Sequence, residues 1–510
     1  MSYQISKRTL LAVIGILGIF HIVTFSQIPW VKTGESWYVS PAYAHFKNGT
    51  FENPMFPDLV NLENGSFGQG KLRYLVQSYS FKLFGFGVYQ ARLPMFLGGM
   101  ILVYLIYLVG RSLFGSHAGL YGATLAVLSR IFYEPHLSYS HSYVACLFIL
   151  AAYFFVRLLH ERKPVYAFAS GFAVWMSLNF HLTGVLGAIP LSFILLHHRL
   201  FNKVNNAQVL FFLSGSLAAL GIWYLFEIVP IGLNAFIEKS SYGVGVAKSH
   251  YIGWQWVKYF SGKRGAFFEL PLLLVVICSF TRFRHKPERQ FFYLFSLGLV
   301  IAYCLFSGSG SLITVWAALF VLAGGLISDI SQSAPGKPRL SRRVCSGVLL
   351  LTLLYYSAFQ LRRGHSAVSI RPLDQYSELT EELASHIPEG KTVIGSPLYW
   401  FKFAGRNPYL AQNFYWERVN SKTGELGDLN QPDSVSVRKM ITFLNRRSVE
   451  YMVADDYFRS SLKTRIPERF WKSIFSIEGE IESQLYGGHS RGGPPPYKIQ
   501  IWRLTNDWTI

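Results

Sequence analysis

The sequence predicts a polytopic α-helical membrane protein with about 11 transmembrane helices over residues 1–360 and an extracytoplasmic α/β domain over residues 361–510. Three observations predict this class. Of the 510 residues, 51% are hydrophobic and only 15% are charged, whereas about a quarter of the residues are charged in soluble proteins. Apolar runs long enough to span a bilayer recur throughout residues 1–360. The remaining segment has the composition of a soluble domain.

The formal net charge of +20 does not indicate a nucleic-acid-binding protein. The Lys and Arg residues stand in short clusters between apolar runs, and no zinc, helix-turn-helix or RNA-binding motif accompanies them. Such clusters are typical of membrane proteins, whose cytoplasmic loops are enriched in basic residues. The cysteines lie in or beside apolar runs without metal-ligand spacing, so we expect them to be small packing residues. They are Cys146, Cys278, Cys304 and Cys345.

The first apolar run, residues 10–28, follows Lys7 and Arg8 and is long enough to span a membrane. No small-residue cleavage site follows it, so we expect a retained helix with a cytoplasmic N-terminus. Ten further spans are predicted by the same criterion. They are at about 93–113, 117–133, 140–158, 165–181, 183–197, 207–229, 265–281, 291–307, 311–329 and 344–360.

Counting these spans alternately places every dense basic cluster on the cytoplasmic side, as the positive-inside rule requires. The clusters are at 157–163, 197–203, 282–289 and 337–343. The pair Arg362-Arg363 falls on the opposite side. Segments 29–93, 229–264 and 362–510 then face outward, and a prokaryotic plasma or inner membrane is the expected location.

The C-terminal segment predicts a small α/β domain made of helix-then-strand units. Residues 374–386 have helical spacing and precede the apolar run 392–395, and residues 435–447 likewise precede 451–454. Residues 497–502 alternate as an edge strand would. Because no glycine-rich motif opens a helix here, we expect no nucleotide site.

The outer loop at residues 30–92 is longer than most connections, which indicates an ordered structure or a function. Tyr38, Ala42 and His45 recur at helical spacing, and Gly49 is a suitable helix end. Glu35 therefore falls in the first turn of a helix, where the helix dipole favours a carboxylate. Capping of this helix is one interpretation of Glu35.

Five short motifs in the first half of the chain occur in an order that resembles the GT-C glycosyltransferases. They are Glu35-Ser36-Trp37-Tyr38, Lys71-Leu72-Arg73-Tyr74, Lys82-Leu83-Phe84-Gly85, Ala91-Arg92-Leu93-Pro94 and Tyr107-Leu108-Val109-Gly110-Arg111. The resemblance covers about residues 10–200. It is greatest to the branch that holds the protein O-mannosyltransferases, the aminoarabinose transferases and the Rgt-type glycosyltransferases.

This resemblance implies transfer of a sugar, with inversion, from a polyprenyl-phosphate donor to a lipid, glycan or protein acceptor at the outer face. A carboxylate must deprotonate the acceptor hydroxyl, and positive charge or a divalent metal ion must stabilise the departing phosphate. The first loop of the family usually carries Asp-Glu, whereas this chain has Gly34-Glu35. Three alternatives follow: Glu35 is the base, Asp58 or Glu63 replaces it, or the activity has been lost.

The remaining site candidates come from the outer segments. The first loop offers His45, Lys71 and Arg92 as substrate-binding residues. In the second outer segment, His141-Ser142-Tyr143 stands where the family has Arg-Pro-Asp or Arg-Pro-Glu, so His141 and Tyr143 are also substrate-binding candidates.

Glu134 and His136 are weak candidates for binding a divalent metal. Anchoring of helix ends at the membrane interface is the alternative interpretation of the histidines and Tyr143.

His181 lies at a break between two predicted spans, where a polar group usually faces a cavity. A histidine satisfied by packing is the alternative there. Lys263 and Arg264, in the third outer segment, are candidates for contact with a lipid phosphate.

Two other functions fit parts of the sequence. A transporter or flippase would perform no chemistry, but the repeated pair of broken spans common in transporters is absent. A silent relative that binds a glycolipid is favoured by Gly34 in place of the acid. The sequence specifies neither the sugar nor the acceptor.

Overall fold

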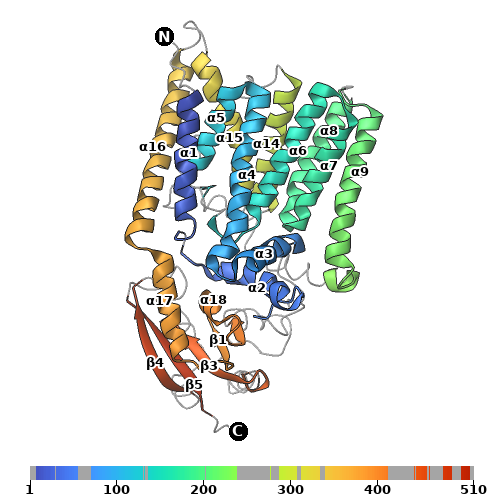
Figure 1. Ribbon diagram of the computed structural model, residues 1–510. Coiled ribbons are helices and arrows are strands. Elements are labelled where there is room, and N and C mark those ends of the chain that lie inside the picture. The colour runs from blue at the N-terminus through green and yellow to red at the C-terminus, as the bar shows by residue number, and fades with distance from the viewer. Residues whose placement is uncertain are drawn as a thin grey trace. The chain divides into compact units, whose positions relative to one another are not determined.

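The computed structural model describes most of the chain and divides it into two compact units (Figure 1). The described residues are 7–28, 30–55, 70–129, 131–132, 136–200, 203–237, 286–306, 312–332, 339–411, 444–456, 475–484 and 496–505, with the single residues 276, 442 and 459. The helical unit comprises residues 1–26, 67–76 and 92–366, and the mixed unit comprises residues 27–66, 77–91 and 367–510.

The helical unit is built from long apolar helices. Their bounds are α1 Lys7–Thr24, α4 Val88–Phe114, α5 Ser116–Leu128, α6 His141–Glu161, α7 Pro164–Met176, α8 Val185–Leu200, α9 Asn206–Trp223, α14 Pro287–Phe306, α15 Leu312–Gln332 and α16 Arg339–Ser369. Short 3-10 turns, η3 Ser177–Asn179 and η4 Leu182–Gly184, join α7 to α8, and a π-helical turn, η5 Tyr224–Ile228, continues α9.

Six described helical segments are long and apolar enough to cross a membrane. They are Lys7–Thr24, Val88–Phe114, His141–Glu161, Leu182–Arg199, Asn206–Ile228 and Ile313–Ser331. The predicted class, a multi-pass helical membrane protein, is therefore confirmed, whereas the count of eleven is not. The predicted span at 265–281 lies outside the described residues except for Val276.

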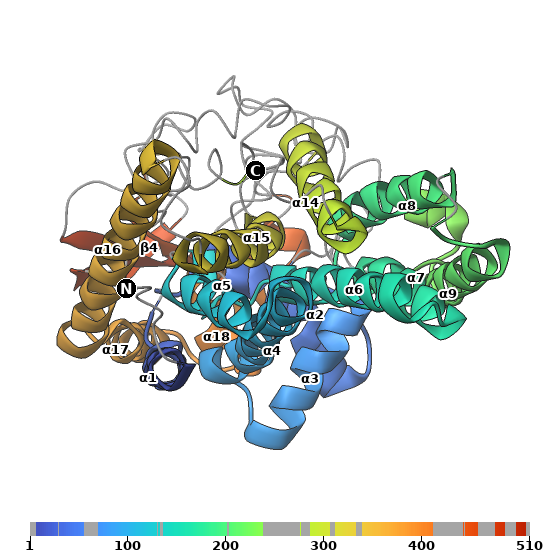
Figure 2. The ribbon, with the colours of Figure 1, turned by 90° about the horizontal axis from the view of Figure 1, so that it is seen from above.

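Glycines set the closest helix packing in this unit, between α7 and α9, which lie side by side with α6 in Figure 2. A Cβ atom on Gly171 would lie 2.2 Å from the carbonyl oxygen of Phe212. A Cβ atom on Gly215 would lie 2.1 Å from the carbonyl oxygen of Phe168. Small residues let two helix backbones approach this closely. In lipid, burying apolar surface between helices gives little free energy, so such close packing drives helix association instead.

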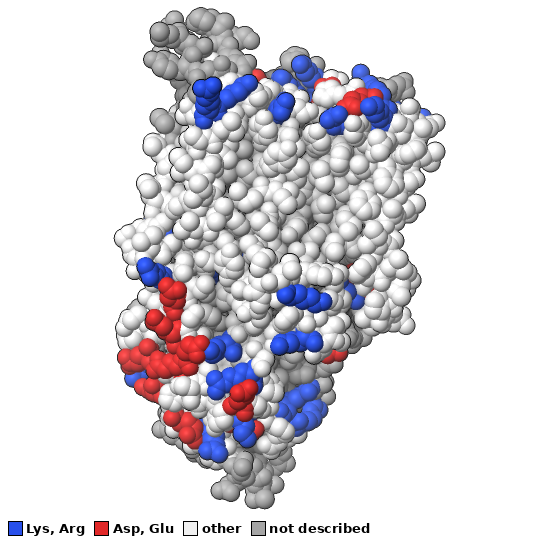
Figure 3. Space-filling model, viewed as in Figure 1, with Lys and Arg blue, Asp and Glu red and all other residues white. Residues whose placement is uncertain are grey.

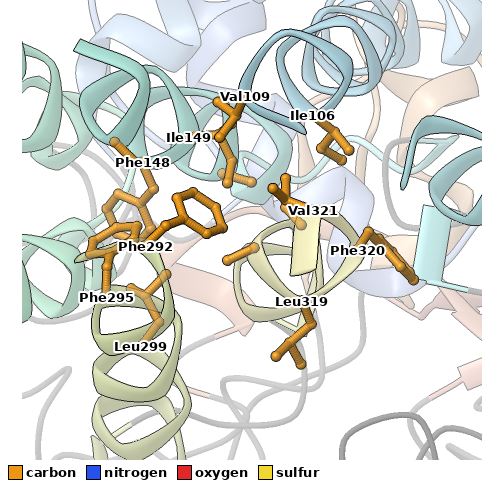
Figure 4. Close-up of a cluster of buried hydrophobic side chains, with 14 of the residues drawn as sticks. Ile106, Val109, Phe148, Ile149, Phe292, Phe295, Leu299, Leu319, Phe320 and Val321 are labelled. Atoms are coloured by element: carbon orange, nitrogen blue, oxygen red, sulfur yellow. The ribbon is translucent and has the colours of Figure 1, made fainter. Parts of the chain in front are cut away.

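The interior of the helical unit is apolar and closely packed. Side chains from α4, α6, α14 and α15 converge in Figure 4, including Val109, Phe148, Phe292 and Val321, all inaccessible to solvent. Where lipid surrounds the helices, the van der Waals packing of such side chains stabilises the contacts between them. This core fixes the helices whose ends carry the polar residues described below.

Basic loops gather at one end of the helical unit. Arg289 Nε donates to the carbonyl of Leu113, and Gln208 Nε2 donates to the carbonyl of Arg162, so the α4 end, the α6–α7 turn and the starts of α9 and α14 are neighbours. In Figure 3 the sides of this unit carry almost no charge, whereas Lys and Arg gather at its uppermost end.

The N-terminus of α1 lies at the same end, because Leu10 packs on Leu120 near the start of α5 and His21 binds Val127 near its end. This grouping is what the predicted topology requires. Which side of a membrane the basic end faces stays a prediction.

The mixed unit contains α2 Thr33–Asn48, α17 Pro372–Ser385, α18 Trp400–Phe403 and one five-stranded sheet (Figure 1). The helix α3, Lys71–Phe84, begins in the helical unit and ends in the mixed unit. The strands are β1 Thr392–Gly395, β2 Tyr409–Ala411, β3 Val449–Ala454, β4 Phe475–Ser483 and β5 Tyr497–Leu504. Their order is β2-β1-β3-β5-β4, in which β1 is parallel to β2 and β3 and β5 is antiparallel to β3 and β4.

The predicted helix at 374–386 and the strands at 392–395, 451–454 and 497–502 are confirmed as α17, β1, β3 and β5. The prediction that the last of them is an edge strand is wrong. β5 pairs with both β3 and β4, and the edge strands are β2 and β4. The alternation of β5 reflects one buried face, because Ile499 and Ile501 are fully buried. Most of the predicted helix at 435–447 lies outside the described residues.

Within the mixed unit, α2 is tied to the α/β part of the chain. Tyr43 packs against Phe86 and Trp400, with ring centroids 4.3 Å and 5.6 Å away. The amide of Ala411, at the end of β2, donates to the carbonyl of Met55 at 3.1 Å. The described start of the predicted loop, residues 30–55, is therefore ordered within this unit.

Candidate functional site

A cluster of cationic and imidazole side chains lies at the end of the helical unit opposite the basic loops. It is built from the first turn of α3, the first residue of α6, the break between α7 and α8, and the π-turn after α9. We call this group the α3-start cluster. It consists of Gly70, Lys71, Arg73, His141, His181 and Glu227.

Gly70 fixes where α3 begins. Its amide donates to the carbonyl of Phe180 at 3.1 Å, and a Cβ atom at this position would lie 2.0 Å from the carbonyl oxygen of Asn179. Only glycine allows this approach without a shift of backbone. The start of α3 is thereby held against the break between α7 and α8.

Lys71 is held by two successive residues of the π-turn. Its ammonium donates to the carbonyl of Phe226 at 2.7 Å, and its backbone amide donates to the carboxylate of Glu227. Burial lowers the pKa of Lys71, while the charge of Glu227 raises it, and burial has the larger effect. The charge of the Glu227 carboxylate therefore favours the protonated Lys71 ammonium, whereas burial favours its neutral form.

Arg73 is fully buried two residues further along α3, and its guanidinium donates to the carbonyl of Ser138 just before α6. The imidazoles of His141 and His181 lie close together, with ring centroids 4.8 Å apart, and Arg73 acts on both electrostatically. His181 Nδ1 also accepts the amide of Thr183 at 3.0 Å. One guanidinium and two imidazoles thus lie near one another, and together they can donate hydrogen bonds to an anion.

Glu35 lies in the mixed unit and has no solvent exposure. One carboxylate oxygen accepts the amide of Lys32 at 3.1 Å, which satisfies a backbone donor at the start of α2. The capping interpretation of Glu35 is therefore what the structure shows. Its role as a base stays a prediction.

His45 also lies in the mixed unit, on the last turns of α2. Its Nδ1 atom lies 2.9 Å from Ser78 Oγ, and its ring stacks on Phe51 with centroids 4.5 Å apart. Burial, and secondly the charge of Lys82, lower the pKa of His45. These contacts hold the imidazole in one orientation in its neutral form.

Tyr143 and Arg92 use their polar groups to hold helix ends. The Tyr143 hydroxyl donates to the carbonyl of Pro94 at 2.8 Å, and its ring stacks on Phe180. Arg92 is fully buried and donates to the carbonyls of Phe25 and Ser26, just after α1. The structure shows structural contacts for both, and their role in substrate binding stays a prediction.

His136 belongs to a buried network with His21 and Arg363. Arg363 is one of the two basic residues that the predicted topology places on the side opposite the other basic clusters. The guanidinium of Arg363 lies 2.6 Å from His136 Nδ1 and 2.9 Å from His21 Nδ1, and it also donates to Thr24. A fixed positive charge at this distance does not suit a divalent metal ion, so His136 does not fit a metal ligand. Within the described part of the chain, no group of three His, Cys, Asp or Glu side chains is placed to hold a metal.

Several predicted site residues have no described position, and two charged residues of the cluster, as well as Gly70, were not predicted. Asp58, Glu63, Glu134, Lys263 and Arg264 lie outside the described residues. Arg73 and Glu227 were missed. The signal for Glu227 was available, because a carboxylate inside an apolar span usually has a function. Arg73 belongs to the motif Lys71-Leu72-Arg73-Tyr74, which served the sequence analysis only through its place in the order of motifs.

Comparisons with known proteins show that this fold is similar to those of two membrane enzymes of known structure. ArnT from Cupriavidus metallidurans bound to undecaprenyl phosphate matches with a TM-score of 0.57 and 14% identity, over 97% of both chains. The Archaeoglobus fulgidus oligosaccharyltransferase matches with a TM-score of 0.56 and 12% identity, over 97% of this chain and 76% of that one. The same enzyme in complex with Zn and sulfate matches with a TM-score of 0.51 and 13% identity, over 93% of this chain and 72% of that one.

A family model matches part of the chain. The model for dolichyl-phosphate-mannose-protein mannosyltransferase matches residues 72–234. This range begins in α3 and runs past the π-turn, so it includes four of the charged or imidazole residues of the α3-start cluster. A comparison with curated sequences found no match.

Proposed function

We propose that the protein transfers a sugar from a polyprenyl-phosphate donor to an acceptor at the outer face of the cytoplasmic membrane, with inversion. The observation that carries this proposal is the α3-start cluster, in which the first turn of α3 holds Lys71 against the π-turn and Arg73 near two imidazoles. The similar ArnT structure is bound to undecaprenyl phosphate, and one Archaeoglobus fulgidus AglB structure holds a dolichol-phosphate. The same class of lipid phosphate suits the cluster of this chain.

In this proposal the α3-start cluster binds the donor phosphate. When the bond between the sugar carbon and the phosphate oxygen breaks, negative charge develops on the departing phosphate. The guanidinium of Arg73 and the ammonium of Lys71 stabilise that charge, and a neutral imidazole of His141 or His181 donates a hydrogen bond. Because these groups are buried and already oriented, little reorganisation is needed during the reaction.

The acceptor hydroxyl must lose its proton as it attacks the sugar carbon, and we propose Glu35 as the base. It is the acid that stands at the family motif, beside Gly34. Asp58 and Glu63, from the same loop, are the substitutes to test if Glu35 only caps α2.

The orientation follows from the distribution of basic residues. We propose that the basic end and the N-terminus face the cytoplasm. The α3-start cluster, at the opposite end of the same unit, then lies at the extracytoplasmic face. The C-terminal residues 361–510 form the extracytoplasmic domain in this arrangement.

Replacing Glu35 by Gln is expected to lower sugar transfer about 10²- to 10⁴-fold, the usual contribution of a general base. The amide oxygen of Gln can still accept the amide of Lys32, so the α2 cap is retained. Turnover of polyprenyl-phosphate sugars by the purified proteins is the measurement. Glu52→Gln is the matched control, because Glu52 is an exposed acid of the same loop. Equal turnover of wild type and Glu35→Gln would remove Glu35 as the base.

A further inference from the structure

We propose that Glu227 is a positioning residue that keeps the ammonium of Lys71 charged and correctly placed for the donor phosphate, through the π-turn at the end of α9. This inference rests on the proposed function, because it assigns Lys71 to the phosphate. No feature of the family resemblance that we described involves Glu227. Three features of the structure support this inference: the backbone of the π-turn, the position of the Glu227 carboxylate and the charges around Lys71.

The first feature is the backbone hydrogen bonding at the end of α9. The amide of Val229 donates to the carbonyl of Tyr224 at 3.1 Å, five residues earlier, so the helix widens over Tyr224–Ile228. Single π-turns of this kind are rare and occur frequently at functional sites. Here the widened turn presents the carbonyl of Phe226 and the carboxylate of Glu227 to the same residue, Lys71.

The second feature is the position of the carboxylate. Glu227 lies in the apolar segment Asn206–Ile228 and is 6% exposed. A buried carboxylate in such a segment is costly unless it has charged or hydrogen-bonding partners. It accepts the first amide of α3, at the positive end of that helix dipole, and its charge acts on the Lys71 ammonium. A carboxamide could fill the hydrogen-bonding role alone, so the charge requires a separate reason.

The third feature is the balance of charge around Lys71. Lys71 is 6% exposed, and burial lowers its pKa. The other titratable groups of the cluster are Arg73, His141 and His181, and none of them carries negative charge. Glu227 supplies the negative charge that raises the pKa of Lys71. A phosphate needs a charged ammonium, so loss of the carboxylate would weaken phosphate binding as the pH rises.

The direction of the pH effect follows. Lys71 binds phosphate in its protonated form, so binding is present below its pKa and is lost as the pH rises through it. Removing the charge of Glu227 lowers that pKa further, so the loss occurs at a lower pH. An opposite charge nearby favours the charged form of an ammonium group, so its removal favours the neutral form. If Glu227 only anchored the start of α3, its replacement would leave the pH dependence of phosphate binding unchanged.

The test is the pH dependence of undecaprenyl phosphate binding to the purified full-length protein, wild type and Glu227→Gln. Gln keeps an acceptor oxygen for the Lys71 amide and removes only the charge. We expect the alkaline loss of binding to move towards neutrality, in the direction that follows from the loss of the Glu227 charge. Glu288→Gln, at the basic end of the same unit, is the matched control and should leave the profile unchanged. An unchanged profile for Glu227→Gln would overturn the inference.

Two additional variants, Lys71→Arg alone and combined with Glu227→Gln, distinguish an effect on the charge of Lys71 from a general disturbance of the structure. Arg does not titrate in the accessible pH range, so Lys71→Arg removes the group on which Glu227 acts. In the Lys71→Arg background, adding Glu227→Gln should not move the alkaline limb. A shift of equal size in that background would show that Glu227 acts on another group and would contradict the proposal.

A second measurement does not depend on the donor. The rate of Lys71 modification by a small amine-selective reagent, followed by mass spectrometry across pH, reports the pKa of Lys71 directly. Glu227→Gln should react at lower pH than wild type. If wild type bound no undecaprenyl phosphate, the proposed function would fail, and the labelling profile would still decide whether Glu227 controls the charge of Lys71.

Discussion

Lys71→Met is expected to weaken binding of undecaprenyl phosphate about 10- to 100-fold. Met has similar length and cannot donate a hydrogen bond. A charge-assisted hydrogen bond contributes about 1.5–3 kcal/mol, and 1.4 kcal/mol corresponds to a factor of ten. The dissociation constant of the purified protein for undecaprenyl phosphate, measured by native mass spectrometry, tests this.

Lys71→Arg is the control for the Lys71→Met prediction, because it keeps the positive charge and a donor. It should retain most of the affinity that Lys71→Met loses. Equal affinity in wild type and Lys71→Met would contradict the assignment of Lys71 to the phosphate, even if the protein transfers sugar by another arrangement.

Gly70→Ala is expected to abolish phosphate binding by displacing the start of α3. The added Cβ atom would lie 2.0 Å from the carbonyl oxygen of Asn179, so the backbone must move, and Lys71 and Arg73 move with it. Overpacking of this kind typically costs about 1–3 kcal/mol, so the melting temperature should also fall. Thermal unfolding and undecaprenyl phosphate binding, measured on the same preparation, test both effects.

Gly221→Ala is the control for the Gly70→Ala prediction. A Cβ atom on Gly221, in α9, meets no atom within 4 Å. The same methyl group should therefore leave binding intact and stabilise the helix slightly, since Ala has a higher helix propensity than Gly. If Gly70→Ala behaved like Gly221→Ala, the proposed docking of the α3 start would be wrong.

Much of the fold could be predicted because its signals are local. Apolar runs gave the helices of the helical unit, and helical spacing gave α2, which ends at Gly49 in the left-handed conformation (φ 73°). The strand β2 was missed because three residues are too few to show a period. The strand β4 was missed because its pairing with β5 is irregular between Ile477 and Gly479. The position of β5 within the sheet depends on β4, so it could not be read from the alternation of β5 alone.

The site was predicted less completely, because residue type does not reveal which partner is within reach. Lys71, His141 and His181 are predicted as polar residues of outer segments. The structure places the two imidazoles 4.8 Å apart and Lys71 against the π-turn. Tyr143 and Arg92 were chosen on the same grounds, yet their polar atoms bind backbone carbonyls at helix ends. Glu227 could have been found from its rare position in an apolar span. Its pairing with Lys71 joins residues 156 positions apart, and only the fold shows it.

The central claim is that the purified protein consumes a polyprenyl-phosphate sugar and releases the lipid phosphate. The most direct test incubates the protein with labelled undecaprenyl-phosphate sugars and a membrane extract as acceptor, and follows free undecaprenyl phosphate. We predict that wild type releases it together with labelled acceptor, and that Lys71→Met does so much more slowly. Movement of intact donor across proteoliposome membranes without release of undecaprenyl phosphate would contradict the account and favour a transporter.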